Sequence, residues 1–81
     1  MVKHADMHDD ELRRAIHHGI VVLAGNSRLR IFGKLRCASG MRMKKENRVF
    51  FASKKEALQH GYRPCGHCLH KEYKDWRNGT V

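Results

Sequence analysis

The chain has 81 residues, of which 41% are hydrophobic, and its 17 basic and 8 acidic side chains give a formal net charge of +9. Its longest apolar run, from Ile20 to Ala24, is far too short to cross a bilayer, which excludes a membrane-spanning protein. We expect a single domain spanning 1–81, monomeric by default. A core this small is expected to need a metal, a disulfide or a partner.

The strongly basic balance indicates an anionic partner, of which nucleic acid is the commonest. A solvated basic surface that only keeps the protein in solution explains the charge equally well. The cysteines are Cys37, Cys65 and Cys68, an odd number, and neither a signal peptide nor a long apolar run precedes them. Free or metal-bound thiols in a reducing cytoplasm fit this pattern best.

The first half of the chain predicts one helix and a hairpin. Residues 1–7 carry no periodic pattern and are expected to be a frayed start. A helix over 9–18, capped by Asp9, turns Leu12, Ala15 and Ile16 to one face and ends before Gly19. Strands over 20–24 and 28–32 are joined by a turn at Gly25-Asn26-Ser27.

The second half predicts one more strand and two helices. The irregular basic segment 34–45 precedes an aromatic and β-branched strand over 48–52. Ser53 and Glu56 form a capping box for a short helix that ends near His60. A last helix is expected from Cys65, because Leu69, Tyr73 and Trp76 recur at helical spacing. This spacing favours a position in the core for the rings of Tyr73 and Trp76 over a role in stacking on nucleic-acid bases.

Together the elements predict a small α+β domain with an antiparallel sheet of about three strands and two to three helices. The pair Cys65-Gly66-His67-Cys68 suits either a zinc site or a dithiol redox couple. Redox enzymes of this motif place it directly after a strand of a βαβ unit, whereas here a helix, Gly61 and Pro64 precede it. The pattern therefore favours metal over redox chemistry, and a third reading makes the cysteines small buried hydrophobes.

Several separate motifs between Ile31 and Cys68 resemble the zinc-binding N-terminal domain of the Ada protein, which repairs methylated DNA phosphates. That family has Ile-Phe-Cys, three residues, Cys, then Glu-Asn and a Phe-Phe strand, then Gly-Phe-Arg-Pro-Cys-x-x-Cys. The matching segments here are Ile31-Phe32-Gly33 with Cys37, Glu46-Asn47-Arg48-Val49-Phe50-Phe51, and Gly61-Tyr62-Arg63-Pro64-Cys65-Gly66-His67-Cys68. The resemblance implies a family-like core over 20–76, held by Zn²⁺.

Carried over by position, the resemblance makes Cys37, Cys65 and Cys68 zinc ligands. The family's first cysteine is both a ligand and the acceptor of the methyl group, and its position here is Gly33. The resemblance therefore implies a module that is related to DNA repair but accepts no methyl group. The fourth ligand stays open between His17, His18, His67, His70, water and none.

The predicted function is a non-catalytic zinc module that contacts nucleic acid, DNA rather than RNA, through basic side chains. The candidate contacts are Lys34, Arg36, Arg42, Lys44, Lys45, Arg48 and Arg63. Two alternatives belong to other classes: an enzyme that uses the thiols as a redox or alkyl-accepting centre, and an adaptor that binds other proteins.

Overall fold

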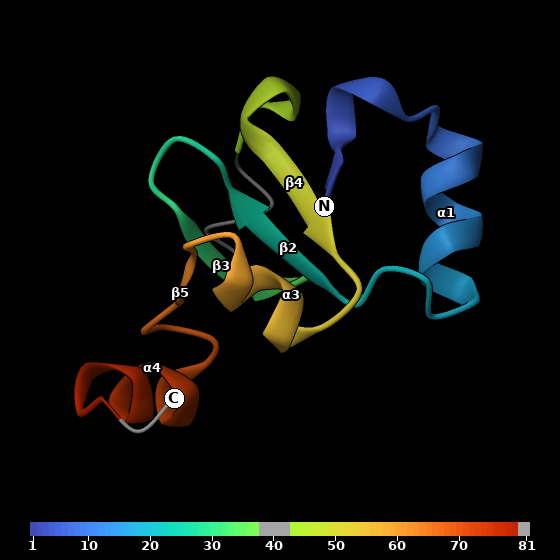
Figure 1. Cartoon of the computed structure of the whole chain (residues 1–81). Helices are drawn as coiled ribbons and strands as arrows, with labels where there is room; N and C mark the ends of the chain where they lie inside the picture. Colours follow the sequence, from blue (N-terminus) through green and yellow to red (C-terminus); the bar gives the residue numbers. More distant parts are fainter. Residues whose placement is uncertain (38–42, 80–81) are drawn as a thin grey trace.

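A computed structural model of the chain describes residues 1–37 and 43–79 as a small α+β fold, as expected. Within these residues the centre is a five-stranded sheet in the order β1-β4-β2-β3-β5, accompanied by three helices, of which the last lies apart from the sheet (Figure 1). The strands are β1 (Val2–Lys3), β2 (Leu23–Asn26), β3 (Ile31–Lys34), β4 (Arg48–Phe51) and β5 (Arg63–Pro64). The helices are α1 (Asp9–His17), α3 (Lys54–Gln59) and α4 (His70–Arg77), with short 3₁₀ turns η1 (His4–Asp6) and η2 (Lys45–Asn47).

The predicted three-stranded antiparallel sheet is present as β3, β2 and β4, but two short strands extend it. At one edge β1 pairs antiparallel with β4, and at the other β5 pairs parallel with β3, so the sheet is mixed. The prediction of a frayed start at residues 1–7 was therefore wrong. Strand pairing uses backbone groups, so β1, which is exposed on both sides, needs no apolar alternation in its own sequence.

Both hairpin strands begin three residues later than predicted and end two residues later. Helix α1 is followed by Gly19 at φ +69°, and Ile20 N–H donates to the Ala15 carbonyl at 2.8 Å, so this stretch completes the helix end. Ile20 and Val22 consequently lie outside the core, 62% and 43% exposed. At the other end, the Asn26 side-chain oxygen accepts from Arg28 N–H and Leu29 N–H and closes the turn that leads into β3.

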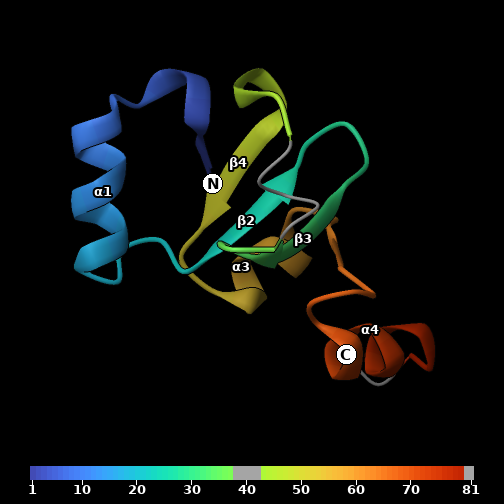
Figure 2. The same cartoon turned by 180° about the vertical axis from the view of Figure 1, so that it is seen from behind.

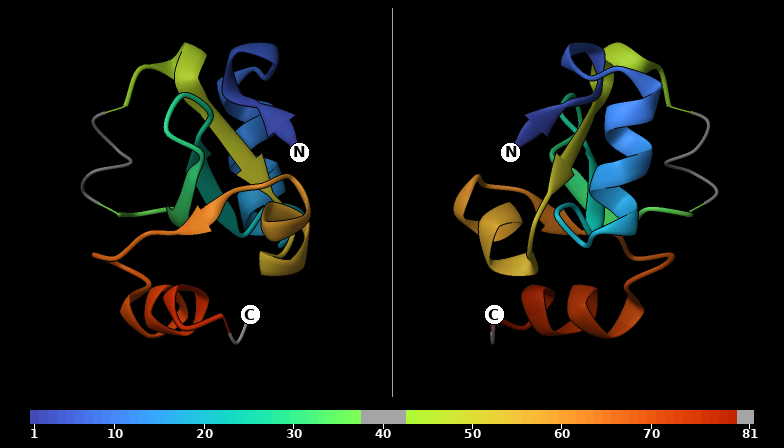
Figure 3. Two further views of the ribbon diagram at one scale, coloured as in Figure 1. Left: turned by 60° about the vertical axis from the view of Figure 1, so that its left-hand side comes forward. Right: turned by 90° about the vertical axis from the view of Figure 1, so that its right-hand side faces the viewer.

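Two thin cores lie on opposite faces of the sheet, with α1 over one face and α3 on the other side (Figure 3). Phe50 packs with Ala15, Val21 and Ala24 on the α1 side. Its neighbours along β4 face the other way, because side chains alternate in a strand. The larger cluster there consists of Phe32, Val49, Phe51, Ala57, Tyr62 and Leu69. Ile16, which the sequence placed on the inner face of α1, is 42% exposed.

The capping box of α3 is present in a slightly shifted form. The Ser53 hydroxyl accepts from Glu56 N–H at 3.1 Å, and the Glu56 carboxylate accepts from Ala52 N–H at 2.8 Å. The fold begins α4 only at His70, five residues after the predicted start at Cys65, because the intervening residues form turns. Helix α4 follows β5 in the chain and lies apart from the sheet (Figure 2). Trp76 is 39% exposed, so the core position predicted for it was wrong.

Among the helices that the structure describes, none is both long enough and apolar enough to cross a membrane.

Candidate metal centre

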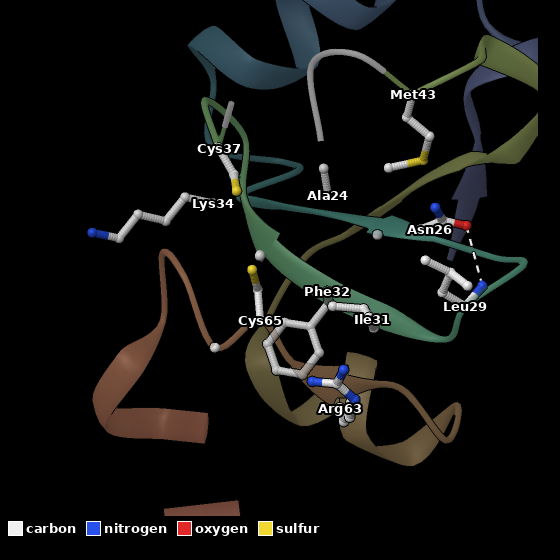
Figure 4. A pocket seen from close by; sticks show the side chains of 13 residues that line it. Ala24, Asn26, Leu29, Ile31, Phe32, Lys34, Cys37, Met43, Arg63 and Cys65 are labelled. Carbon is white, nitrogen blue, oxygen red and sulfur yellow. Dashed lines mark hydrogen bonds between the residues drawn. The ribbon is translucent and has the colours of Figure 1, made fainter. Parts of the chain in front are cut away.

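The three cysteines come from three segments of the chain and meet at the β3–β5 edge of the sheet. Cys37 follows β3, Cys65 follows β5, and Cys68 stands shortly before α4. Their sulfur atoms all lie within 4.8 Å of one another. Figure 4 shows the Cys37 and Cys65 sulfurs pointing toward each other.

Parallel pairing between β3 and β5 makes this meeting possible. Phe32 is opposite Pro64, and Cys65 N–H donates to the Phe32 carbonyl at 2.7 Å. The chain then turns back, with Leu69 N–H bonded to the Cys65 carbonyl at 3.0 Å, and this turn brings Cys68 beside Cys65. The short Cys-x-x-Cys spacing therefore supplies two thiols from one turn, while the segment after β3 supplies the third.

Backbone amides support two of the sulfurs. Lys34 N–H donates to Cys68 Sγ at 3.3 Å, and His67 N–H donates to Cys65 Sγ at 3.4 Å. Hydrogen bonds of this kind stabilise negative charge on sulfur and orient a ligand around a metal. The sequence did not predict these amides, because a backbone group has no signature in side-chain pattern.

Burial raises the pKa of the Cys68 thiol to about 11, and the neighbouring Cys37 and Cys65 thiols act in the same direction against the Lys34 hydrogen bond. A reactive cysteine has a lowered pKa and is partly ionised at neutral pH. In the absence of a metal Cys68 is therefore a protonated thiol, whose proton a bound metal displaces.

The donor set fits zinc in chemistry and in position. Thiolates are the ligands that structural zinc sites use most, and zinc sites of this class take four donors. The three sulfurs account for three of them. At the remaining side Gly33 faces the cluster: a Cβ built on this residue would lie 2.6 Å from Cys68 Sγ and 3.2 Å from Cys65 Cβ.

No histidine joins the three sulfurs in the described part of the chain, where the cysteines alone form the group. The rings of His17 and His18 contact each other at the exposed end of α1, with centroids 5.2 Å apart. His67 and His70 are exposed on the loop after β5 and at the start of α4. The four histidines left open by the sequence therefore lie outside the cluster.

The basic candidates fall into two groups by environment. Four of them are exposed, namely Lys34, Arg36, Lys44 and Lys45. Arg42 lies outside the described residues. Arg48 is half-buried: its guanidinium donates to the Leu35 carbonyl at 2.9 Å and lies 5.2 Å from the Phe50 ring centroid, and burial lowers its pKa. The Arg63 guanidinium contacts Tyr73 and Trp76 and donates to the Pro64 carbonyl.

Three clustered thiols on a small α+β scaffold define the protein as a metal-binding module. Its family follows from comparison: the family model described as the metal binding domain of Ada matches residues 13–70, and the chain belongs to this family. Neither a search of curated proteins nor one of solved structures gave a significant match. The family resemblance drawn from the sequence is thereby confirmed.

Proposed function

We propose that the protein is a zinc-binding module that contacts DNA through exposed basic side chains and transfers no methyl group. The observation that carries the metal part is the group of three sulfurs within 4.8 Å of one another in a chain of the Ada metal-binding family. Zinc is the metal that a cluster of thiolates in a small domain most often holds.

The proposed DNA contact rests on charge and exposure. The chain carries a net charge of +9, and Lys34, Arg36, Lys44 and Lys45 are all exposed. Exposed ammonium and guanidinium groups gain binding free energy by releasing the counterions of the phosphate backbone. Arg48 and Arg63 have their charged groups engaged inside the fold, so we assign them supporting roles and leave phosphate contact to the exposed group.

The proposed absence of methyl transfer rests on Gly33. The family's acceptor is a cysteine at this position, and glycine offers no nucleophile there. A mass increase of one methyl group after incubation with methylated DNA would overturn this part of the proposal.

DNA contact is tested by the anisotropy of a labelled duplex titrated with zinc-loaded protein at several salt concentrations. The logarithm of the binding constant should fall linearly with the logarithm of the salt concentration. The double variant R36Q/K44Q should lower this slope by about two, because each lost phosphate contact removes about one.

The matched control is K54Q/K55Q, which removes the same charge from two exposed lysines of α3, an element separate from the segments that carry Arg36 and Lys44. It should leave the slope close to that of the wild type. Binding that does not depend on salt, or an equal loss in both double variants, would contradict a specific basic surface. No binding at low salt would exclude DNA contact altogether.

A further inference from the structure

We infer that the centre keeps one metal coordination position open at Gly33, and that the adjoining pocket admits a small organic thiol carrying a carboxylate as the external ligand. The inference rests on the zinc site proposed above and concerns what occupies its fourth position. It gives the module a ligand-binding role in addition to a structural one.

The first observation is the direction in which Gly33 faces. A Cβ at this residue would meet Cys68 Sγ at 2.6 Å, Cys65 Cβ at 3.2 Å and Cys37 Cβ at 4.0 Å, so position 33 faces all three cysteines. A side chain at position 33 could supply a donor atom to the metal, whereas glycine supplies none. Within the described residues no histidine or carboxylate replaces it. A zinc site with three protein ligands takes its fourth from solution.

The second observation is a pocket of about 270 Å³ that opens beside the cluster and is lined by Gly33, Cys37 and Cys65 (Figure 4). Its remaining walls are mostly apolar and include Ala24, Ile31 and Met43. An external ligand can therefore approach the open position without displacing any described element of the fold. Figure 4 also shows the Lys34 side chain pointing away from this pocket.

The chemistry of the lining selects the ligand. A centre already bound by soft thiolates favours another soft donor, so the metal-binding end of the ligand is a thiol. It binds as the thiolate, one S–metal bond replaces the bond to water, and the thiol proton passes to solvent. The apolar walls suit a short hydrocarbon body.

Arg63 supplies the group that recognises the far end of the ligand: its guanidinium contacts the Tyr73 and Trp76 rings and donates to the Pro64 carbonyl, and a guanidinium has further N–H donors for a small ligand in this pocket. It lines the same pocket, and Figure 4 shows it on the opposite side from Cys37. Arg63 is opposite Ile31 in the sheet register, two residues along β3 from Gly33, a separation of about 7 Å at the usual strand rise. This span suits a short mercapto acid whose carboxylate accepts hydrogen bonds from the Arg63 guanidinium.

The test uses the full chain loaded with cobalt(II), whose sulfur-to-metal charge-transfer absorption grows with the number of bound thiolates. Adding 3-mercaptopropionate to the wild type should raise this absorption, in saturable fashion, from the level of three thiolates to that of four. Propionate, which lacks the thiol, should change nothing. The G33C variant should show the four-thiolate spectrum from the start and should not respond to the added thiol.

A second variant tests the role of Arg63, and because Arg63 also contacts Tyr73 and Trp76 of α4, two thiols are compared to separate ligand recognition from the loss of that contact. R63Q should weaken the binding of 3-mercaptopropionate by about tenfold, because a charge-assisted hydrogen bond is lost. The same variant should bind 2-mercaptoethanol, which carries no carboxylate, as the wild type does. Equal weakening for both thiols would overturn the assignment of Arg63.

The outcomes separate this inference from the proposed function. A wild-type protein that holds one cobalt ion but does not respond to millimolar thiol would overturn the open position and leave the metal site intact. A G33C variant that responds like the wild type would also overturn it. A protein that holds no cobalt would overturn both the inference and the zinc site on which it rests.

Discussion

The character of the metal centre depends on Gly33, a residue with no side chain. Because a Cβ at this position would lie 2.6 Å from Cys68 Sγ, glycine has two effects at once. It leaves the protein one donor short of four, and it allows Cys68 to approach β3 closely enough to accept Lys34 N–H. A cysteine introduced here must push Cys68 aside before both sulfurs can bind one metal, so the change alters ligand geometry as well as ligand number.

A second residue, His4, predicts a pH dependence of stability. Its ring contacts Phe50, with centroids 5.3 Å apart, and Nδ1 is buried without a hydrogen-bond partner in the described part of the chain. Burial, followed by the charges of Arg48 and Lys45, lowers its pKa below the ordinary 6.5, against a smaller opposing effect of Asp9. The folded protein therefore binds fewer protons than the unfolded chain just below that value.

It follows that the contribution of His4 to stability is complete above about pH 6.5 and falls as the pH is lowered toward the folded pKa. Denaturant unfolding of zinc-saturated wild type and H4Q should give a difference that is larger at about pH 7.5 than at about pH 5.5. Protonation of the thiols affects both proteins and cancels in this comparison. A difference that stays constant, or grows as the pH falls, would contradict a neutral His4 imidazole with a buried Nδ1.

At the scale of the elements, α4 is held by aromatic and cationic contacts rather than by an apolar core. None of its residues is buried. The Arg63 guanidinium of β5 lies 5.3 Å from the Tyr73 ring centroid and 5.9 Å from that of Trp76, and the two rings stack with centroids 6.0 Å apart. Since α4 begins two residues after Cys68, this contact also fixes the chain that leaves the metal centre.

Replacing Tyr73 should show how much this contact contributes. Y73A removes the ring that stacks on Trp76 and faces Arg63, and should lower the free energy of unfolding by about 1–2 kcal/mol. Y73F keeps the ring and should stay within about 0.5 kcal/mol of the wild type. Trp76 is the only tryptophan, so its fluorescence during denaturant unfolding reports on α4 directly. If Y73A and Y73F had the same free energy of unfolding, the contact of the Tyr73 ring with Trp76 and Arg63 would not hold α4 in place.

The elements also explain which parts of the fold could be predicted. Strand β4 and helix α3 were found because their signals are local: the apolar run of β4 and the Ser53–Glu56 cap lie within a few residues. Strands β1 and β5 were missed because each has two residues and exists only through a partner strand distant in sequence. The start of α4 was misplaced since the residues after Cys65 turn toward the sulfurs instead of continuing a helix.

For the site, the Cys65-x-x-Cys68 spacing predicted one pair of thiols, and the resemblance to the Ada family placed Cys37 beside them. The pocket beside them was not predictable, because Ala24, Ile31 and Met43 are ordinary apolar residues that gain a role only when the hairpin and the segment before β4 meet. The histidines could be excluded as ligands only with the fold in hand. Seven of them occur along the chain, and their spacing in the sequence does not single out one as the fourth ligand.

At the scale of the whole molecule, the sheet separates two cores that are each too small to be stable alone. Among the described residues, four buried hydrophobic residues form the cluster on the α1 side and six form the cluster on the other side. The three sulfurs join β3, the end of β5 and the turn before α4, so a bound metal would connect the sheet to the C-terminal part of the chain. In a domain of this size such a cross-link contributes a large share of the net stability.

Removing the metal should therefore destabilise the entire fold. At free zinc about 1,000 times the dissociation constant, binding stabilises the native state by about 4 kcal/mol, which corresponds to a shift of about 15 °C or more in Tm for a domain of this length. Thermal unfolding followed by circular dichroism should show this loss after chelation, with recovery on adding zinc but not magnesium, which prefers oxygen ligands. The C68S variant should unfold at the lower temperature whether or not zinc is present. If chelated and zinc-loaded protein unfold at the same temperature, the three thiols are a packed cluster and the fold does not depend on a metal.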